Sequence, residues 1–197
     1  MSRALDLAIS AVALVLLSPL MALAALWVNF DSRGPVLFRQ LRVGRGGVPF
    51  EIYKFRTMRA GDGPLITVVD DPRITRSGRF LRRTKIDELP QLFNVLDGTM
   101  SLVGPRPEVP RYVDLWPSAE RAAVLSVRPG ITDPGSVTFA RESELLAEAD
   151  DPERYYIEEI LPRKVAIYAD YVAHRTLGQD LRILIRTVAV LLGRGKQ

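Results

Sequence analysis

Two adjacent carboxylates, Asp87 and Glu88, follow a run of basic side chains and precede a proline and a short apolar segment. An Asp at such a position is a favoured helix N-cap, and both the helix dipole and neighbouring arginines stabilise its ionised form. A carboxylate that stays ionised at neutral pH can attack phosphorus or ligate a hard cation. An adjacent Asp and Glu can divide these roles, one attacking and the other holding Mg²⁺. An ordinary acidic helix start has the same composition and is the alternative.

Cations that could hold phosphate occur at two further places. Lys54 and Arg56 are two residues apart in an alternating segment, so a strand would place both on one face, to hold a diphosphate or to face solvent. Arg106 lies between Pro105 and Pro107. Such a turn is stiff, and a bidentate phosphate contact from it would lose little entropy.

The composition excludes several kinds of chemistry. The 197 residues include no cysteine, which excludes a disulfide scaffold, a thiolate zinc site and a cysteine nucleophile. The single histidine, His174, argues against a His-rich metal site or a Ser-His-Asp triad. With 47% hydrophobic and 25% charged residues the chain is not intrinsically disordered, and its length indicates one folded domain.

The apolar residues are concentrated near the N-terminus. Residues 7–28 form an uncharged run that would be roughly 33 Å long as a helix, enough to cross a bilayer core. The run is longer than the apolar core of a signal peptide, and bulky residues follow it, so we expect a retained membrane segment. Ser18-Pro19 interrupts it, and basic residues flank both ends. A helix that enters and returns puts both basic ends on one face; a kinked single span is the alternative.

Charge is segregated along the rest of the chain. Residues 33–85 hold 13 basic and 4 acidic side chains, whereas residues 86–152 hold 5 basic and 12 acidic ones. A basic stretch beside a membrane segment indicates attraction to anionic headgroups first and a phosphate-binding surface second. Nucleic-acid binding is a third interpretation, which fits poorly with a membrane anchor.

Periodicity predicts a small sheet and several helices. Alternating apolar and polar residues over 35–44 and 48–58 predict two strands joined at a glycine-rich turn. Pro162 is expected to kink or split a helix, and the last helix carries an apolar stripe suited to a core or to a membrane interface. The helices are expected over 86–96, within 108–127, and over 142–151, 155–173 and 180–192.

These motifs, in this order, resemble the bacterial sugar transferase family. The resemblance consists of the apolar segment with Ser-Pro, then FRQLRVGRGGVPFEIYKFRTM, GRFLRRTKIDELPQLFNVLDGTMSLVGPRP and RPGIT. It runs from about residue 2 to residue 190, and the pairing of Asp-Glu-Leu-Pro-Gln with Ser-Leu-Val-Gly-Pro-Arg-Pro is highly specific.

The resemblance implies a small monotopic phosphoglycosyl transferase in its minimal catalytic form. Such enzymes move a sugar-1-phosphate from a UDP-sugar to a polyprenol (undecaprenyl) phosphate and release UMP at the cytoplasmic face of the bacterial inner membrane. By similarity, Asp87 would be the nucleophile that forms an aspartyl phosphosugar, and Glu88 would ligate Mg²⁺. The family positions near the phosphates correspond to Lys54, Arg56, Arg82, Arg106 and Pro107.

One segment departs from the family pattern. Many members continue Pro-Gly-Ile-Thr with Gly and a segment that ends Gln-Val-Asn-Gly-Arg, whereas residues 133–141 read DPGSVTFAR and resemble a variant within the family. Arg141 is the candidate in this segment for nucleotide or sugar recognition, and the departure puts that role in question.

The expected fold is α/β (α+β), membrane-associated and monotopic, with a hairpin and helices around the active site. Residues 1–32 are expected to form the re-entrant membrane helix and residues 33–197 a cytoplasmic-face catalytic domain with C-terminal amphipathic helices. The expected partners are the UDP-sugar, polyprenol phosphate and membrane lipids, without nucleic acid; a homodimer is compatible with the sequence. The transferred sugar and the pathway (capsule, exopolysaccharide, O-antigen or glycoprotein) stay open. A catalytically silent membrane adaptor is the rival from another class.

Overall fold

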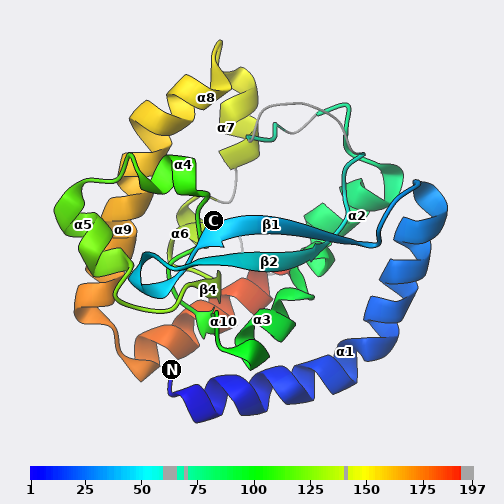
Figure 1. The fold of residues 1–197 in the computed structure, drawn as a ribbon, viewed down its shortest axis with the longest axis horizontal. Helices are drawn as coiled ribbons and strands as arrows, with labels where there is room; N and C mark the ends of the chain where they lie inside the picture. Colours follow the sequence, from blue (N-terminus) through cyan, green and yellow to red (C-terminus); the bar gives the residue numbers. More distant parts are fainter. Residues whose placement is uncertain (60–65, 69–70, 140–141, 192–197) are drawn as a thin grey trace.

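The N-terminal helix α1 (Arg3–Asp31) bends near its middle (Figure 1), and Pro19 lies inside it. The computed structural model describes residues 1–59, 66–68, 71–139 and 142–191. Pro19 has no amide hydrogen to donate to the carbonyl of Val15 one turn earlier. The Ser18 hydroxyl donates to that same carbonyl at 2.8 Å and so replaces the lost hydrogen bond. The predicted break is therefore present and locally satisfied.

Both ends of α1 attach to the same globular body. At the start, Arg3 donates to the backbone carbonyl of Leu96 at 3.2 Å. At the other end, Asp31 accepts hydrogen bonds from the backbone N–H and the hydroxyl of Ser77, each at 2.8 Å. Between these attachments the helix exposes large apolar side chains, and it is long and apolar enough to cross a membrane. The helix is thus bent and held by the same body at both ends, while its entry into and return from a membrane stays a prediction.

The predicted hairpin is confirmed. Strands β1 (Leu37–Val43) and β2 (Pro49–Phe55) pair antiparallel, and the short 3₁₀ turn η1 (Arg45–Gly47) joins them. The hairpin crosses the centre of the molecule, with α1 curving around one end of it (Figure 1). Phe50 and Ile52 of β2 are buried in one cluster while Glu51 between them is exposed, so the alternation of the sequence decides which face of this part of the hairpin packs inward.

A second pair of strands is short and parallel. β3 (Ser101–Val103) and β4 (Gly130–Thr132) lie side by side. The chain that follows β3 passes very close to the start of β4, because a Cβ on Gly130 would lie 2.1 Å from the backbone nitrogen of Gly104. Glycine is required where two backbones approach this closely. The pair therefore brings the segments at its two ends into defined positions.

Helices surround both pairs of strands, and the buried apolar residues form three clusters. One joins α4, α5, α7 and α9, with Trp116 and Val165 buried in it, and a second joins β2, α3 and β3, with Val95 and Met100 fully buried. The third joins α1, β2 and α2. The remaining elements are α2 (Arg76–Thr84), η2 (Ile86–Glu88), α3 (Gln91–Asp97), α4 (Pro110–Val113), α5 (Ser118–Val124), α6 (Gly135–Thr138), α7 (Glu142–Glu148), α8 (Pro152–Tyr155), η3 (Tyr156–Ile160), α9 (Leu161–His174) and α10 (Leu177–Leu191).

Prolines divide two of the predicted helices. The helix expected over 86–96 is a 3₁₀ turn followed by α3, because Pro90 cannot donate the hydrogen bond that would join them. The helix expected within 108–127 is α4 and α5, separated at Pro117. Near Pro162 the chain is not interrupted: the π-helical turn η3 continues directly into α9. The expected kink or split is therefore present only as a change of helix type.

The last helix, α10, uses its predicted apolar stripe in two directions. Leu184 packs against the core, whereas Leu181 and Ile185 are exposed. The core-packed alternative therefore describes one side of this helix, and the interfacial alternative stays a prediction for its exposed side.

Candidate active site

The carboxylate pair lies in a strained connection between α2 and α3. Lys85, which ends α2, has a left-handed backbone (φ 57°), and among the described residues it is the one non-glycine with positive φ. This conformation costs roughly 1 kcal/mol or more. The turn η2 follows at once and holds Asp87 and Glu88. The expectation that Asp87 caps a helix is wrong, because α3 begins only at Gln91.

Glu88 is enclosed by two cations from distant parts of the chain. Lys54 Nζ of β2 donates to Glu88 Oε1 at 2.8 Å, and the guanidinium of Arg106 donates to both carboxylate oxygens. Burial alone would raise the pKa of Glu88, but the charges of Arg106 and Lys54 outweigh it and hold this pKa well below its usual value. Glu88 is thus firmly ionised.

Asp87 lacks the close cation contacts that surround Glu88, and its pKa shifts in the opposite direction. It is 7% exposed, and its Oδ1 has no hydrogen-bond partner among the residues that the structure describes. Burial, and next the charge of Glu88, raise the pKa of Asp87 above its usual value. The attraction of Lys54, Lys85 and Arg82 opposes this increase without overcoming it. The prediction that a helix dipole and arginines lower this pKa is therefore wrong.

Neighbouring carboxyl groups whose pKa values are pushed apart are typical of sites that divide chemical roles. Asp87 has a buried oxygen without a hydrogen-bond partner, and a poorly solvated carboxylate of this kind favours nucleophilic attack. Glu88 is held in place by its cations and keeps its charge. The geometry thus supports different roles for the two.

The turn that carries Arg106 is held at both of its prolines. Gly130 of β4 donates its backbone N–H to the Pro105 carbonyl at 2.9 Å. On the other side, Arg42 of β1 donates to the buried Pro107 at its carbonyl, 3.2 Å away. The predicted stiff turn is confirmed, and it holds Arg106 against Glu88.

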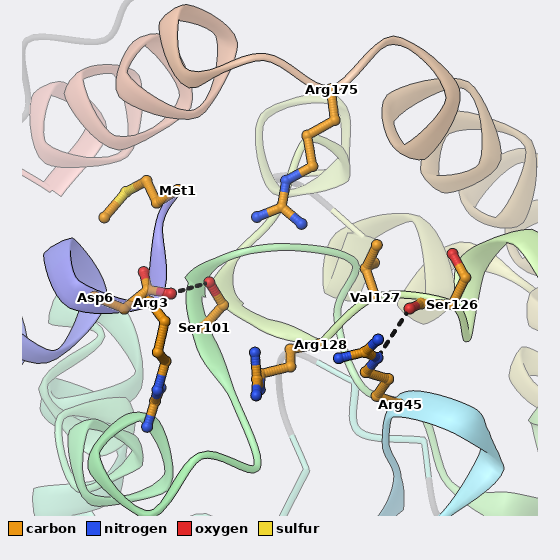
Figure 2. A pocket seen from close by; sticks show the side chains of 9 residues that line it. All are labelled: Met1, Arg3, Asp6, Arg45, Ser101, Ser126, Val127, Arg128 and Arg175. Atoms are coloured by element: carbon orange, nitrogen blue, oxygen red, sulfur yellow. Dashed lines mark hydrogen bonds between the residues drawn. The ribbon is translucent and has the colours of Figure 1, made fainter.

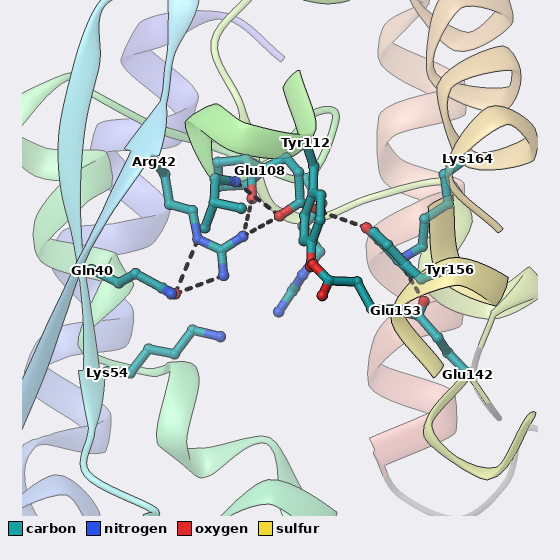
Figure 3. Close-up of polar contacts among 12 residues, drawn as sticks. Gln40, Arg42, Lys54, Glu108, Tyr112, Glu142, Glu153, Tyr156 and Lys164 are labelled. Carbon is teal, nitrogen blue, oxygen red and sulfur yellow. Dashed lines mark hydrogen bonds and ion pairs between the residues drawn. The ribbon is translucent and has the colours of Figure 1, made fainter. Parts of the chain in front are cut away.

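Arg42 and Glu108 are site residues that sequence reasoning missed. Arg42 also donates to Glu108 Oε1 at 2.7 Å, and the Tyr156 hydroxyl donates to Glu108 Oε2 at 2.6 Å (Figure 3). Burial raises the pKa of Tyr156, with Glu108 adding to the effect, so its hydroxyl remains a donor. Gln40 and Arg42 are two residues apart on β1, so strand alternation places them on one face, where Gln40 accepts a hydrogen bond from Arg42. This spacing was the signal in the sequence that could have identified Arg42 as a site residue.

Asp133 and Tyr168 complete the surroundings of Arg106. Asp133 directly follows β4 and is buried, and the Tyr168 hydroxyl donates to it at 3.1 Å. The charge of Glu88, with a smaller contribution from Asp133, raises the pKa of Arg106 well above its usual value. Sequence reasoning placed Asp133 only in the segment that departs from the family pattern.

Of the remaining predicted site residues, Arg82 acts on the carboxylate pair and Arg56 does not. Arg82 donates to the Met58 sulfur at 3.5 Å, and its charge acts on Asp87. Arg56 is buried and donates to the carbonyls of Val28 at 3.3 Å and Ser32 at 2.6 Å, so it attaches the end of α1 and does not accompany Lys54. The expectation that the two cations jointly hold a diphosphate is not supported by this arrangement. Arg141 lies outside the described residues.

The carboxylate pair could supply some, but not all, of the ligands that Mg²⁺ needs. Among the described residues no cluster of three or more acidic, His or Cys side chains could hold a metal by itself. Mg²⁺ is often held by one or two carboxylates together with substrate phosphates. The unpartnered Oδ1 of Asp87 and the adjacent Glu88 supply such oxygens, so the residues present fit a metal shared with a phosphorylated substrate.

Comparison with known proteins gives a consistent result. The model of the family described as bacterial sugar transferase matches residues 1–194. A UDP-glucose:undecaprenyl-phosphate glucose-1-phosphate transferase of Caulobacter vibrioides is 42% identical over 96% of this chain and 69% of its own length. The exopolysaccharide production protein PSS of Rhizobium leguminosarum bv. phaseoli is 38% identical over 100% of this chain and 97% of its own length.

A relative named for a different sugar is similar too. The UDP-N-acetylgalactosamine-undecaprenyl-phosphate N-acetylgalactosaminephosphotransferase of Aeromonas hydrophila is 36% identical over 96% of this chain. The chain spans 43% of that protein and less than half of several other relatives. Overall similarity therefore does not identify the sugar.

Proposed function

Because the chain belongs to the bacterial sugar transferase family, we propose that it transfers a sugar-1-phosphate from a UDP-sugar to undecaprenyl phosphate and releases UMP. The observation that carries this proposal is the buried, unpartnered oxygen of Asp87 beside a Glu88 held by Lys54 and Arg106. The names of the relatives support the same donor and acceptor classes.

The proposed reaction has two displacements at one phosphorus. A carboxylate oxygen of Asp87 attacks the β-phosphorus of the UDP-sugar, and the bond from this phosphorus to the oxygen that bridges the two phosphates breaks. UMP leaves with the bridging oxygen, and the sugar phosphate stays on Asp87. A phosphate oxygen of undecaprenyl phosphate then attacks the same phosphorus and releases the Asp87 carboxylate.

The cations around Glu88 have a second task in this proposal. A bound diphosphate carries the charge and oxygen geometry that attract Lys54 and the fork of Arg106. Glu88, released in part from these cations, would hold Mg²⁺ together with the substrate phosphates, and Asp87 would lie next to it. The metal would supply charge neutralisation for the leaving UMP.

We further propose that α1 enters the membrane and returns at the cytoplasmic face. Its two ends attach to one body, its middle exposes apolar side chains, and Arg3 and Arg33 lie at its opposite ends. Single cysteines at Ser2 and Gln40, in a chain that has none of its own, test this topology. Neither should react with an impermeant reagent added from the periplasm; reaction of one alone would mean a full crossing.

The activity is tested with purified protein, undecaprenyl phosphate, Mg²⁺ and a panel of UDP-sugars, with UMP release as the measurement. Incubation with the donor alone should add the mass of one sugar phosphate to the intact protein, and Asp87→Asn should not acquire it. UMP release without any adduct in the absence of acceptor contradicts the two-step route, and no release from any donor contradicts the transfer itself.

A further inference from the structure

A pocket of about 210 Å³ lies outside the candidate active site and is lined by four arginines, Arg3, Arg45, Arg128 and Arg175 (Figure 2). They come from the start of α1, the hairpin turn, the segment before β4 and the segment before α10. The arginines therefore converge from four parts of the chain. None of the residues that line the pocket belongs to the candidate active site.

The pocket is electropositive because its one acidic lining residue is already engaged. Asp6 accepts a hydrogen bond from the Ser101 hydroxyl at 2.7 Å and one from the Leu102 backbone N–H at 3.3 Å. Asp6 is 3% exposed, and its carboxylate serves to attach α1 to β3. Against four guanidinium groups this leaves a clear excess of positive charge in the lining.

Two of the arginines are held through their Nε atoms, which leaves their terminal nitrogens free. Arg45 donates its Nε to the Ser126 carbonyl at 3.1 Å, and Arg128 donates its Nε to the Gly98 carbonyl at 2.8 Å. Within the described part of the chain, neither forms an ion pair. Both side chains are thus oriented by neutral backbone groups, while their terminal nitrogens can donate in pairs to an oxyanion.

The other two arginines differ in their availability. Arg175 points into the pocket from the segment between α9 and α10 (Figure 2). It also forms an ion pair with Asp180, with 3.5 Å between Nη2 and Oδ2. Both terminal nitrogens of Arg3 donate to backbone carbonyls, those of Leu96 in α3 and of Met100 just before β3. Arg3 therefore contributes positive charge to the pocket more than free hydrogen-bond donors. Arg45, Arg128 and Arg175 are therefore the expected ligands.

We propose that this pocket binds a phosphate group, either that of an anionic membrane lipid or free inorganic phosphate. A phosphate has the charge and the several acceptor oxygens that guanidinium forks recognise. The elements beside the pocket expose apolar side chains, Leu96 of α3 and Leu177 of α10, which favours the lipid source. The site would hold the body against the membrane at the end of α1 opposite the attachment of Asp31.

The test uses the full chain in detergent, titrated with inorganic phosphate, with short-chain phosphatidylglycerol and with short-chain phosphatidylcholine, while the melting temperature is followed. The pocket variant is Arg45→Gln with Arg128→Gln. Its matched control is Arg154→Gln with Arg163→Gln, two exposed arginines whose loss removes the same charge. A ligand that binds the folded state raises the melting temperature by mass action.

We expect phosphate or phosphatidylglycerol to stabilise the natural protein and the control, with an apparent Kd at least about tenfold weaker in the pocket variant. Stabilisation by inorganic phosphate identifies the free anion, and stabilisation by phosphatidylglycerol without it identifies the lipid. Equal weakening in the pocket variant and the control, or no stabilisation of the natural protein by either ligand, overturns the proposal. If the double variant is poorly folded, Arg175→Gln is the replacement, because Arg175 does not hold the end of α3.

Discussion

The parallel strands β3 and β4 carry arginines at both ends, in opposite electrostatic settings. At the carboxyl end, Arg106 forms an ion pair with Glu88 and lies near Asp133. At the amino end, Arg128, which precedes β4, and Arg45, which comes from the hairpin turn η1, donate to backbone carbonyls. A carbonyl holds a guanidinium in position but carries no net charge, so only the first setting neutralises the arginine.

This difference separates two uses of positive charge. In the candidate active site the cations keep Glu88 ionised and in place, and in the proposed reaction they would exchange that carboxylate in part for the diphosphate. In the pocket Arg45 and Arg128 form no ion pair among the described residues, and their charge is available to an incoming anion at once. Substitutions at the two ends should therefore differ in their effects on turnover and on stability.

The largest effect is expected for Asp87→Asn. Loss of the nucleophile should reduce UMP release by a factor on the order of 10³ or more. The fold should not suffer: the pKa of Asp87 is raised in the folded state, so the neutral form is the better tolerated one, and an amide resembles it. Turnover assays and thermal unfolding at neutral pH check both parts. Near-normal turnover would exclude Asp87 as the nucleophile.

Glu88→Gln should lower the stability of the fold as well as turnover. It leaves Lys54 and Arg106 without their shared carboxylate in a largely buried site, and we expect the free energy of unfolding to fall by about 3 kcal/mol. Turnover should fall as well, because the variant removes the carboxylate that is proposed to hold Mg²⁺. Chemical denaturation measures the first effect, with Asp87→Asn as the adjacent control. An unchanged midpoint would show that the enclosed ion pairs contribute little to the fold.

The acid side of the pH–rate profile should reveal the raised pKa of Asp87. Attack requires the ionised carboxylate, so kcat/KM should fall about tenfold per pH unit below that pKa. Because burial and Glu88 raise it, the decline should begin above the pH at which an ordinary Asp titrates. A profile that stays flat down to the usual range of Asp would contradict the assigned environment.

The smallest effect on stability is expected at the other end of the strands. Arg128→Gln removes one hydrogen bond to a carbonyl but also relieves repulsion among the pocket arginines. The free energy of unfolding should therefore change by less than about 1 kcal/mol, in contrast with Glu88→Gln. Denaturation of both variants under one set of conditions makes the comparison. A loss as large as that of Glu88→Gln would mean that the pocket charges are compensated after all.

Local patterns predicted a large part of this arrangement. Alternation identified the hairpin, the uncharged run with Ser18-Pro19 identified the bent helix, and flanking prolines identified the stiff turn of Arg106. Such features depend on neighbours in sequence, because backbone hydrogen bonding and proline geometry act over a few residues. They do not reveal which distant groups meet, and Arg56 was for that reason assigned to phosphate instead of to the end of α1.

By itself, the sequence determined the family, the carboxylate pair and the amphipathic and apolar segments, since these follow from residue types at short spacing. Only the tertiary structure decided which carboxylate is solvent-poor and open and which is enclosed by cations. It also decided that Arg42 and Glu108 support the Arg106 turn, and that four arginines from separate elements meet in a pocket. Burial and charge interactions depend on distances through space, and residues far apart in the chain become neighbours only when it folds.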